Sequence, residues 1–316
     1  MSSAQPAQTR RTVRVGTRGS RLARWQAQWV CDQIRAHRPG LEVDILEINT
    51  QGDRDRNSPL AKIGGSGVFT KEIQRALLAE TIDVAVHSLK DMPTQGPPGL
   101  TLAAVPARDA MADALVAPRA RTLDALPPAA RVGTSSLRRQ AQLLNIRPDL
   151  QVVSVRGNVE TRLNQAIDGR LEAVVLAEAG LVRLHLEHHV TQRLGPPAFL
   201  PAVGQGALGI ECRSDDETTH ALLVLLEDPA ARRAVVAERR VLAELEGGCM
   251  IPLAAWARDT ADGLALDVHV FSLDGRDKLT ASAIDPKDDP DRLGCQVAQL
   301  LRNLGVERLL RPLGRP

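Results

Sequence analysis

The sequence predicts an α/β fold of two similar lobes followed by a small α+β domain. Strand-like and helix-like segments alternate over the first 225 residues, which is typical of largely parallel sheets. The stretch VGTRGSRLARWQAQ (15–28) is echoed by VGTSSLRRQAQ (132–142), as two lobes facing a cleft would be, although so short a match also arises by chance. From residue 229 onward the pattern changes, which indicates a separate unit.

Local patterns define the elements in order. Residues 12–17 alternate as a strand, and apolar residues recur with helical spacing over 21–37. A second helix is expected at 70–80. Further strands are expected at 41–49, 82–88, 113–117, 131–134, 151–155, 172–177 and 207–212. Proline-rich stretches mark loops at 93–99 and 127–128, and at 195–204 a crossing between lobes.

The last part of the chain has its own alternation of elements. A long helix runs from 229 to the glycines at 247 and 248. Three strand-like runs follow near 250–258, 264–271 and 278–284, and a helix is expected at about 288–304.

Composition bounds the function. Of 316 residues, 43% are hydrophobic and 25% charged, which is ordinary for a soluble globular protein. No apolar run approaches the ~18 residues of a membrane span. The N-terminus MSSAQPAQTRR lacks the apolar core of a secretory signal, so we expect a cytoplasmic protein. A net charge of +2 and 2% aromatic residues argue against nucleic-acid binding.

Four cysteines lie far apart in the sequence: Cys31, Cys212, Cys249 and Cys295. A disulfide framework is not expected in a reducing compartment, and no Cys/His spacing suits a metal such as zinc. Cys249, in LEGGCMIP, follows two glycines at the end of a helix. From its position alone this thiol could be a core residue or a nucleophile.

Basic and polar residues recur immediately after predicted strands. Thirty-five of the 40 basic residues are arginine, which reflects either codon bias or bidentate recognition of carboxylate or phosphate. Ligands of α/β sheets bind beyond the carboxyl ends of strands, where helix N-termini attract anions. We therefore predict a cleft for a polyanion, and for a polycarboxylate in preference to a nucleic acid. The residues concerned are Arg18, Ser20, Ser88, Lys90, Asp91, Thr134, Ser135, Ser136, Arg138, Arg139, Arg156, Asn158, Arg162 and Arg183.

Asp91, in HSLKDMP, is the carboxylate within this basic edge. It is either a turn-forming aspartate or a group that handles protons and stabilises positive charge. The glycines of LAKIGGSGVFTKE lack the G-K-[ST] of a phosphate-binding loop, so we expect a mobile lid near 56–69. Gly204, Gly206 and Gly209 match a dinucleotide pattern, but a strand follows them where a helix is needed.

Eight stretches together resemble the porphobilinogen deaminases, also called hydroxymethylbilane synthases. They occur in the family's order over residues 12 to about 256. They are TRGSRLARWQA, PLAKIGGSGVFTKE, AVHSLKDMP, VGTSSLRRQ, VRGNVETRL, LAEAGLVRL, LPAVGQGALGIECR and LEGGCMIP.

The resemblance implies two lobes like those of periplasmic binding proteins and a third α+β domain. The implied domains are residues 1–106 with 201–225, residues 107–200, and residues 226–316. The implied reaction, in tetrapyrrole biosynthesis, joins four porphobilinogen molecules head to tail with release of ammonia. The family builds this chain on a dipyrromethane cofactor held by a thioether, here to Cys249.

Family roles transfer residue by residue. Asp91 is implied as the catalytic carboxylate. The implied cofactor-binding residues are Cys249, Lys90, Asp91, Thr134, Ser136, Arg138, Arg139, Arg156 and Gly157. The implied substrate-binding residues are Arg18, Ser20, Arg156, Arg162, Arg183 and Gln205. The implied lid residues are Lys62, Ser66 and Phe69.

Two positions depart from the family pattern. Ser66 stands where many relatives have lysine, and Glu160 places an acid beside the basic cleft, where we expect it to face solvent. The family implies a monomer without metal, membrane or nucleic-acid partners. The alternative function is a two-lobed protein that binds an anionic ligand without catalysis, in which Cys249 is inert.

Overall fold

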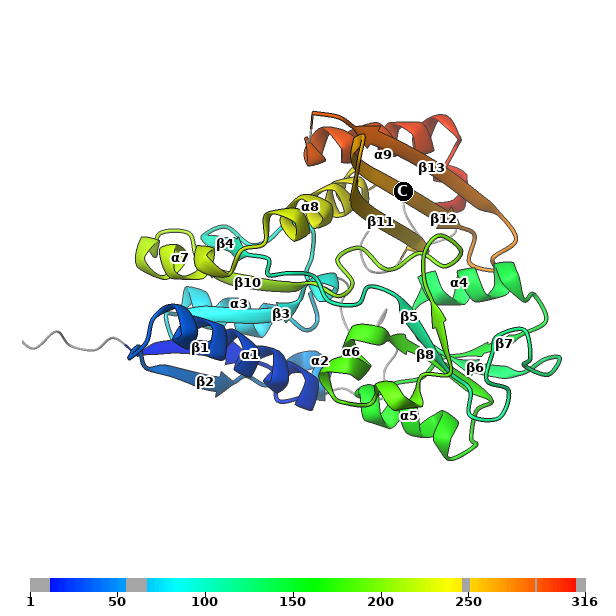
Figure 1. The fold of residues 1–316 in the computed structure, drawn as a ribbon, viewed down its shortest axis with the longest axis horizontal. Coiled ribbons are helices and arrows are strands. Elements are labelled where there is room, and N and C mark those ends of the chain that lie inside the picture. The colour runs from blue at the N-terminus through cyan, green and yellow to red at the C-terminus, as the bar shows by residue number, and fades with distance from the viewer. Residues whose placement is uncertain (1–11, 55–66, 246–250, 288, 311–316) are drawn as a thin grey trace, which may run out of the picture.

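Three β-sheets organise the chain in the computed structural model, which describes residues 12–54, 67–245, 251–287 and 289–310 (Figure 1). We call the parts built on them the first lobe, the second lobe and the third unit. The prediction of two sheet-based lobes and a small α+β unit is confirmed. The predicted domain limits stay a prediction, although the strands of each sheet fall within them.

The first lobe has five strands in the order β2-β1-β3-β10-β4. The strands are β1 (Val13–Thr17), β2 (Val43–Glu47), β3 (Val84–Ser88), β4 (Leu100–Ala104) and β10 (Leu208–Arg213). Its helices and 3₁₀ turns are α1 (Arg21–His37), α2 (Gln51–Arg54), α3 (Lys71–Leu78), η2 (Leu89–Asp91), α7 (Glu217–Leu223) and η4 (Val224–Leu226). Apolar residues of α1 and α3 pack in separate clusters with the sheet strands.

The second lobe repeats this arrangement with the order β7-β6-β8-β5-β9. The strands are β5 (Asp113–Val116), β6 (Arg131–Gly133), β7 (Gln151–Val153), β8 (Ala173–Ala177) and β9 (Gln192–Leu194). Its helices and 3₁₀ turn are α4 (Leu137–Ile146), α5 (Val159–Ile167), α6 (Glu178–Arg183) and η3 (Glu187–His189). The equivalent places of β1 and β6 agree with the echo between residues 15–28 and 132–142.

The sheets are parallel only in part, which corrects the expectation of largely parallel sheets. In the first lobe β1 pairs in parallel with β2 and β3, whereas β10 is antiparallel to β3 and β4. In the second lobe β6 pairs in parallel with β7 and β8, whereas β5 is antiparallel to β8 and β9. β5 is the first strand that the chain forms after it crosses into the second lobe. β10 is the first strand after it returns to the first lobe.

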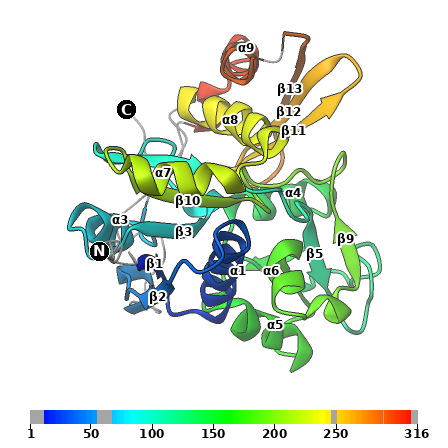
Figure 2. The same ribbon diagram turned by 60° about the vertical axis from the view of Figure 1, so that its left-hand side comes forward.

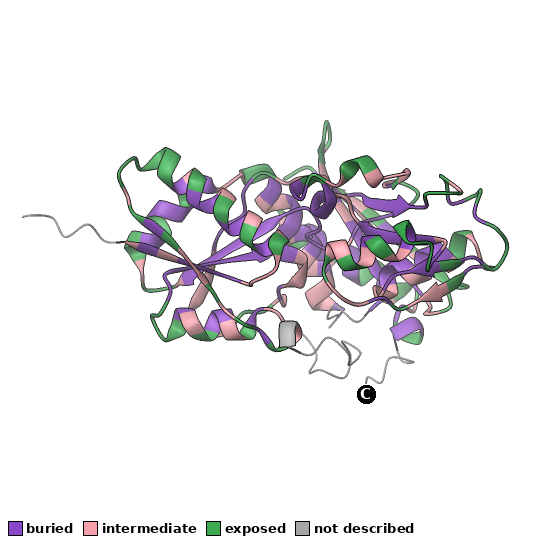
Figure 3. Cartoon of the chain, turned by 90° about the horizontal axis from the view of Figure 1, so that it is seen from below, coloured by how far each residue is buried: buried purple, intermediate pink, exposed green. Residues whose placement is uncertain are grey.

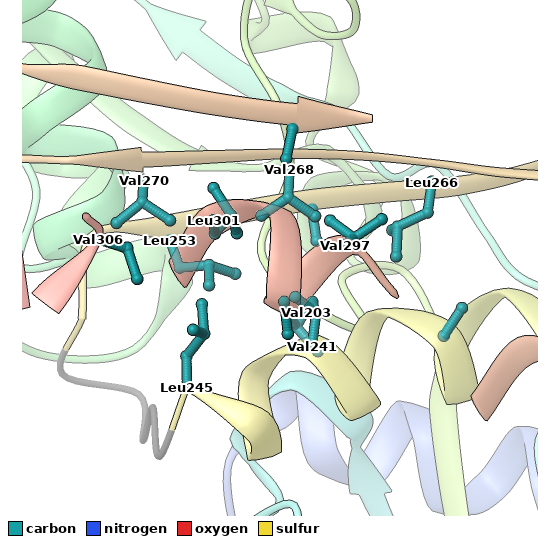
Figure 4. Close-up of a cluster of buried hydrophobic side chains, with 14 of the residues drawn as sticks. Val203, Val241, Leu245, Leu253, Leu266, Val268, Val270, Val297, Leu301 and Val306 are labelled. Carbon is teal, nitrogen blue, oxygen red and sulfur yellow. The ribbon is translucent and has the colours of Figure 1, made fainter. Parts of the chain in front are cut away.

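The third unit is an antiparallel sheet in the order β11-β12-β13, with two long helices on one face (Figure 2). Its elements are α8 (Pro229–Glu244), β11 (Leu253–Thr260), β12 (Gly263–Phe271), β13 (Lys278–Asp285), α9 (Pro290–Asn303) and α10 (Glu307–Leu310). Figure 4 shows Val241 of α8 and Leu301 of α9 gathered with Val268 and Val270 of β12. Val203, from the segment that returns to the first lobe, joins the same cluster.

The burial of residues follows the arrangement of the sheets and helices in layers. Strands are largely buried, and helices expose their outward sides (Figure 3). Polar side chains gather at the carboxyl ends of buried strands, as at Thr17 of β1 and Ser88 of β3. None of the helices in the described ranges has the length and apolar character that a membrane crossing needs.

Candidate functional site

A large cavity lies among both lobes and the third unit. Its volume of about 1490 Å³ exceeds the ~300–1,000 Å³ of pockets for one drug-sized molecule. The third unit contributes Leu242, Ile251 and Leu253 to the lining. The lining also contains most of the residues predicted from the sequence: Arg18, Ser20, Phe69, Lys90, Asp91, Ser136, Arg138, Arg139, Arg156, Gly157, Arg162, Arg183 and Gln205.

Three helices begin at the cavity. Ser20, Ser136 and Asn158 cap α1, α4 and α5, and each accepts a hydrogen bond from a backbone N–H of the first turn. All three caps line the cavity. A helix N-terminus carries a partial positive charge, so these three ends favour an anion in the space that they share.

Among the described residues of the lining, basic side chains outnumber acidic ones. The basic residues are Arg18, Arg21, Arg24, Lys90, Arg138, Arg139, Arg156, Arg162, Arg183 and Arg239. The acidic residues are Glu47, Asp91 and Glu160. This surplus within a concave, partly apolar surface attracts and concentrates anions.

Asp113 holds two of the predicted arginines. Arg138 Nη1 donates to its Oδ2 at 2.7 Å, while Arg139 donates to its Oδ1 from Nε at 2.9 Å and from Nη2 at 2.7 Å. Burial alone would raise the pKa of Asp113, but the two guanidinium groups outweigh it and hold that pKa far below its usual range. Arg139 Nη1 also donates to a backbone oxygen, that of Val175. Arg138 and Arg139 are therefore fixed in the lining by the protein itself.

Arg183 is buried against the segments that connect the lobes. Its Nη2 donates to the carbonyl of Gly206 at 2.7 Å, and its Nε lies 3.2 Å from Asp109 Oδ2. Its guanidinium is 5.8 Å from the ring centre of Trp25 on α1. These contacts tie α6 of the second lobe to the crossing segments and to the first lobe.

Arg162 lies close to several other charged groups of the site. Burial first, and then the charge of Arg139, lower its pKa to about 10, while Asp91 opposes the shift. The residue stays charged at neutral pH. Its Nε donates to the carbonyl of Gly157 at 2.8 Å. Gly157 has a φ of +106°, and a Cβ there would lie 2.8 Å from Thr161 Cβ, so this turn requires glycine.

Lys90 and Asp91 lie on η2, directly after β3. Lys90 Nζ is 3.4 Å from Gln205 Oε1, and Gln205 Nε2 donates to Asp113 Oδ1 at 2.9 Å. Burial, followed by the nearby charge of Arg139, lowers the pKa of Lys90 to about 8. Arg239 of α8 holds the segment after Asp91, donating to two backbone oxygens at 2.7 and 3.2 Å.

Four predicted residues are placed differently or not described. Thr134 is buried, accepts a hydrogen bond from the Ser136 N–H at 3.3 Å, and is not among the lining residues. Lys62, Ser66 and Cys249 lie outside the described residues. Of the predicted lid residues Phe69 is described, and the guanidinium of Arg18 lies 4.1 Å from its ring centre.

Glu160 corrects one expectation. Its side chain lines the cavity and pairs with Arg21 of the first lobe, with Oε1 2.9 Å from Nη1. It does not simply face solvent, because the first turn of α5 lies opposite the first residue of α1.

Asp113, Asp109 and Arg239 were not predicted from the sequence. An acidic residue opening the otherwise apolar strand 113–117 was a usable signal for Asp113, since a charge in a buried strand needs a partner. Asp109 and Arg239 carry no comparable signal. In the described ranges, no group of three His, Cys, Asp or Glu residues is placed to hold a metal ion.

Two family models match the chain. Residues 13–221 match "Porphobilinogen deaminase, dipyromethane cofactor binding domain", and residues 232–303 match "Porphobilinogen deaminase, C-terminal domain". Together they span both lobes and most of the third unit.

Curated relatives agree with these models. A porphobilinogen deaminase of Desulforudis audaxviator is 48% identical over 95% of this chain and 97% of its own. That of Syntrophotalea carbinolica is 47% identical over 95% and 96%. Among solved structures, an arginine-specific periplasmic binding protein of Salmonella typhimurium has a TM-score of 0.38 and 14% identity, over 70% of this chain and 94% of that one.

Proposed function

Since the chain belongs to the porphobilinogen deaminase family, we propose that the cavity between its lobes is where four porphobilinogen molecules are joined into hydroxymethylbilane. The enzyme is a transferase of tetrapyrrole biosynthesis that releases ammonia at each addition. These matches favour it over the alternative of a binding protein without catalysis.

The basic cavity is the observation that carries this proposal. Each porphobilinogen brings an acetate and a propionate, so a chain of pyrroles accumulates carboxylates as it grows. The three helix N-termini and the surplus of arginines are suited to such a ligand. The cavity volume of about 1490 Å³ also suits a ligand larger than one small molecule.

The residues present fit a dipyrromethane cofactor, which the matching family model names. Among the described residues no group accepts a hydrogen bond from the buried Arg138 Nε, as expected of a site that holds anionic groups. We propose that the cofactor is held by Lys90, Asp91, Ser136, Arg138, Arg139, Arg156 and Gly157, with Thr134 acting through Ser136. When bound, it supplies the free pyrrole carbon to which the first substrate is joined.

We propose Cys249 as the covalent anchor of the cofactor. It lies outside the described residues, but Ala243 and Ile251, which lie on either side of it in sequence, line the cavity. A thioether from this cysteine would keep the cofactor attached through every turnover.

Asp91 is proposed as the catalytic carboxylate. Loss of ammonia leaves positive charge on the substrate, and a carboxylate in the cavity lining stabilises that charge. Its oxygens can accept hydrogen bonds from pyrrole N–H groups and take up the proton that leaves the newly bonded carbon. Arg18, Ser20, Arg156, Arg162, Arg183 and Gln205 are proposed to bind or position the carboxylate side chains of the substrate.

The intact mass of the purified protein tests this function. We expect a covalent adduct of two pyrrole units that is absent from Cys249→Ser. Asp91→Asn should keep the fold but lose nearly all turnover. An unmodified mass in well-folded protein, or near-normal turnover of Asp91→Asn, would contradict the respective assignment.

We further propose a cytoplasmic monomer that uses no metal ion, nucleic acid or membrane partner. The family resemblance supports this, and sedimentation of the purified enzyme with metal analysis tests it.

A further inference from the structure

Arg21 and Glu160 form an ion pair between the two lobes. Arg21 is the first residue of α1, and Glu160 lies in the first turn of α5, 139 positions later in the sequence. Arg21 Nη1 donates to Glu160 Oε1 at 2.9 Å. Both side chains line the cavity, so the pair joins the lobes at the site itself.

Apolar contacts place the lobes close together beside this pair. Leu22 of α1 approaches Gly180 of α6, where an added Cβ would lie 3.6 Å from Leu22 Cδ2 and 3.6 Å from Val159 Cγ2. Figures 1 and 2 both show α1 beside α6. The two charged residues therefore meet at a place where packing already brings the lobes into contact.

The pair differs from the buried arginine–carboxylate contacts of the cavity. The side chains of Arg21 and Glu160 are 62% and 30% exposed, whereas Asp113, which holds Arg138 and Arg139, is fully buried. Exposed ion pairs are weak, because water solvates both partners and their side chains stay mobile. An anion in the cavity can therefore displace Glu160 from Arg21, whereas Asp113 keeps its own hydrogen bonds to Arg138 and Arg139.

We propose that Arg21 is a further carboxylate-binding residue for the pyrrole chain, and that Glu160 occupies it until a substrate carboxylate takes its place. Glu160 is the acidic residue that the second lobe contributes to the described lining. Its side chain carries the same carboxylate group as the ligand. Arg21 therefore has a carboxylate partner both before and after the substrate binds. This inference rests on the proposed function.

The two partners predict kinetic effects of opposite sign. Glu160→Gln should lower the KM for porphobilinogen by up to about 5-fold at low ionic strength, because Arg21 no longer has an internal partner. Arg21→Gln should raise the KM by a similar factor, because a binding group is lost. The double variant should behave as Arg21→Gln does. If the pair merely held the lobes together, both single variants would shift the KM in the same direction.

Arg193 and Glu178 provide the matched control. Their ion pair lies within the second lobe, outside the cavity lining, at 2.7 Å, and Arg193 is also 62% exposed. Arg193→Gln and Glu178→Gln should leave the KM unchanged. Thermal unfolding of all variants should confirm that they fold, because both cavity side chains are exposed enough for glutamine to be tolerated.

The proposed function and the role of Arg21 are tested by separate measurements, and the wild-type enzyme serves for the first. Its adduct and turnover test the proposed function, and calorimetric titration with porphobilinogen tests Arg21 by binding alone when every protein compared also carries Asp91→Asn, which should abolish turnover. We expect porphobilinogen to bind most tightly to Glu160→Gln, less tightly to the protein with both native residues, and least tightly to Arg21→Gln. Equal affinities, or single variants that both bind more weakly, would overturn the proposal even if the enzyme is active.

Discussion

Lys90 shows how the surroundings of one residue set a pH dependence. Its pKa of about 8 results from burial and from the charge of Arg139, opposed by Asp91 and Asp113. The charged form is therefore lost as the pH rises through 8, well below the ~10.4 of an unperturbed lysine. Between these values the unfolded chain binds more protons, so this group makes the free energy of unfolding rise with pH.

Catalysis should respond in the opposite direction. We expect kcat/KM to fall as the pH rises through about 8, because Lys90 loses the charge with which it is proposed to hold the carboxylates of the cofactor. Lys90→Arg keeps its charge and should move the fall to higher pH. An identical pH profile in wild type and Lys90→Arg would show that another group causes the fall.

Asp113 should matter for stability as much as for binding. Asp113→Asn removes the negative charge that compensates Arg138 and Arg139 in a buried place. Breaking such a pair costs about 3–5 kcal/mol, which urea unfolding should measure as a loss of free energy of unfolding. Asp149→Asn, at a pair with Arg147 in which the aspartate is 41% exposed, is the control and should move the midpoint much less. Equal midpoints for the two variants would contradict the role of Asp113.

At the scale of single residues, the sequence indicates functional side chains better than it indicates their partners. It identified Arg138, Arg139 and Lys90 from their position after strands, and the structure brings them to one cavity. It could not assign Asp113 as the counter-ion, because the contact spans about 25 residues of sequence and depends on how β5 enters the sheet.

A turn of the third unit docks on a helix of the second lobe. Between β12 and β13, Gly275 has a φ of +71°, and its carbonyl accepts a hydrogen bond from Asn145 Nδ2 at 2.8 Å. A Cβ at this position would lie 2.5 Å from the carbonyl oxygen of Ala141 on α4. Glycine is therefore needed both for the backbone conformation and for the close approach.

Gly275→Ala tests this contact. It should lower the thermal unfolding temperature by more than Gly305→Ala does, because Gly305 has a similar φ of +77° but open space around its would-be Cβ. Both variants share a backbone strain of about 1 kcal/mol. The difference between their unfolding temperatures therefore reports the loss of the docking contact alone. Equal losses would show that the turn is not held against α4.

Elements with strong periodicity were predicted well. The helix expected at 21–37 is α1 with the same limits, and the three strands of the third unit lie within a few residues of their predicted places. β4 and β9 were not predicted, because Leu100–Ala104 and Gln192–Leu194 are short and lack a clear alternation. The antiparallel direction of β5 and β10 is set by the crossings between lobes, which no local pattern records.

At the scale of the whole molecule, Glu238 joins all three parts. This fully buried carboxylate on α8 pairs with Arg108 through both oxygens, at 2.7 and 3.1 Å. It also accepts hydrogen bonds from the backbone N–H groups of Gly204 and Ala257, at 2.8 and 3.0 Å. Arg108 and Gly204 belong to the two segments that cross between lobes.

Glu238→Gln should therefore affect both stability and turnover. Loss of the buried charge beside Arg108 should cost about 3–5 kcal/mol of the free energy of unfolding, because that arginine is left uncompensated. Misplaced crossings should also lower kcat. Glu244→Gln, a partly exposed glutamate on the same helix, is the control. Unchanged thermal unfolding and kcat in Glu238→Gln would contradict this role.

Because the chain crosses between the lobes twice, the second lobe is an insertion in the sequence of the first lobe. The first residue of β5, Asp113, lies opposite the last residue of β9, Leu194. The two ends of the inserted lobe are therefore neighbours. On the other side, Ala104 of β4 lies opposite Ile210 of β10, so the host sheet closes across the insertion point. A homologous lobe could therefore be grafted at the same two joints, because the ends that it must connect are neighbours on both sides.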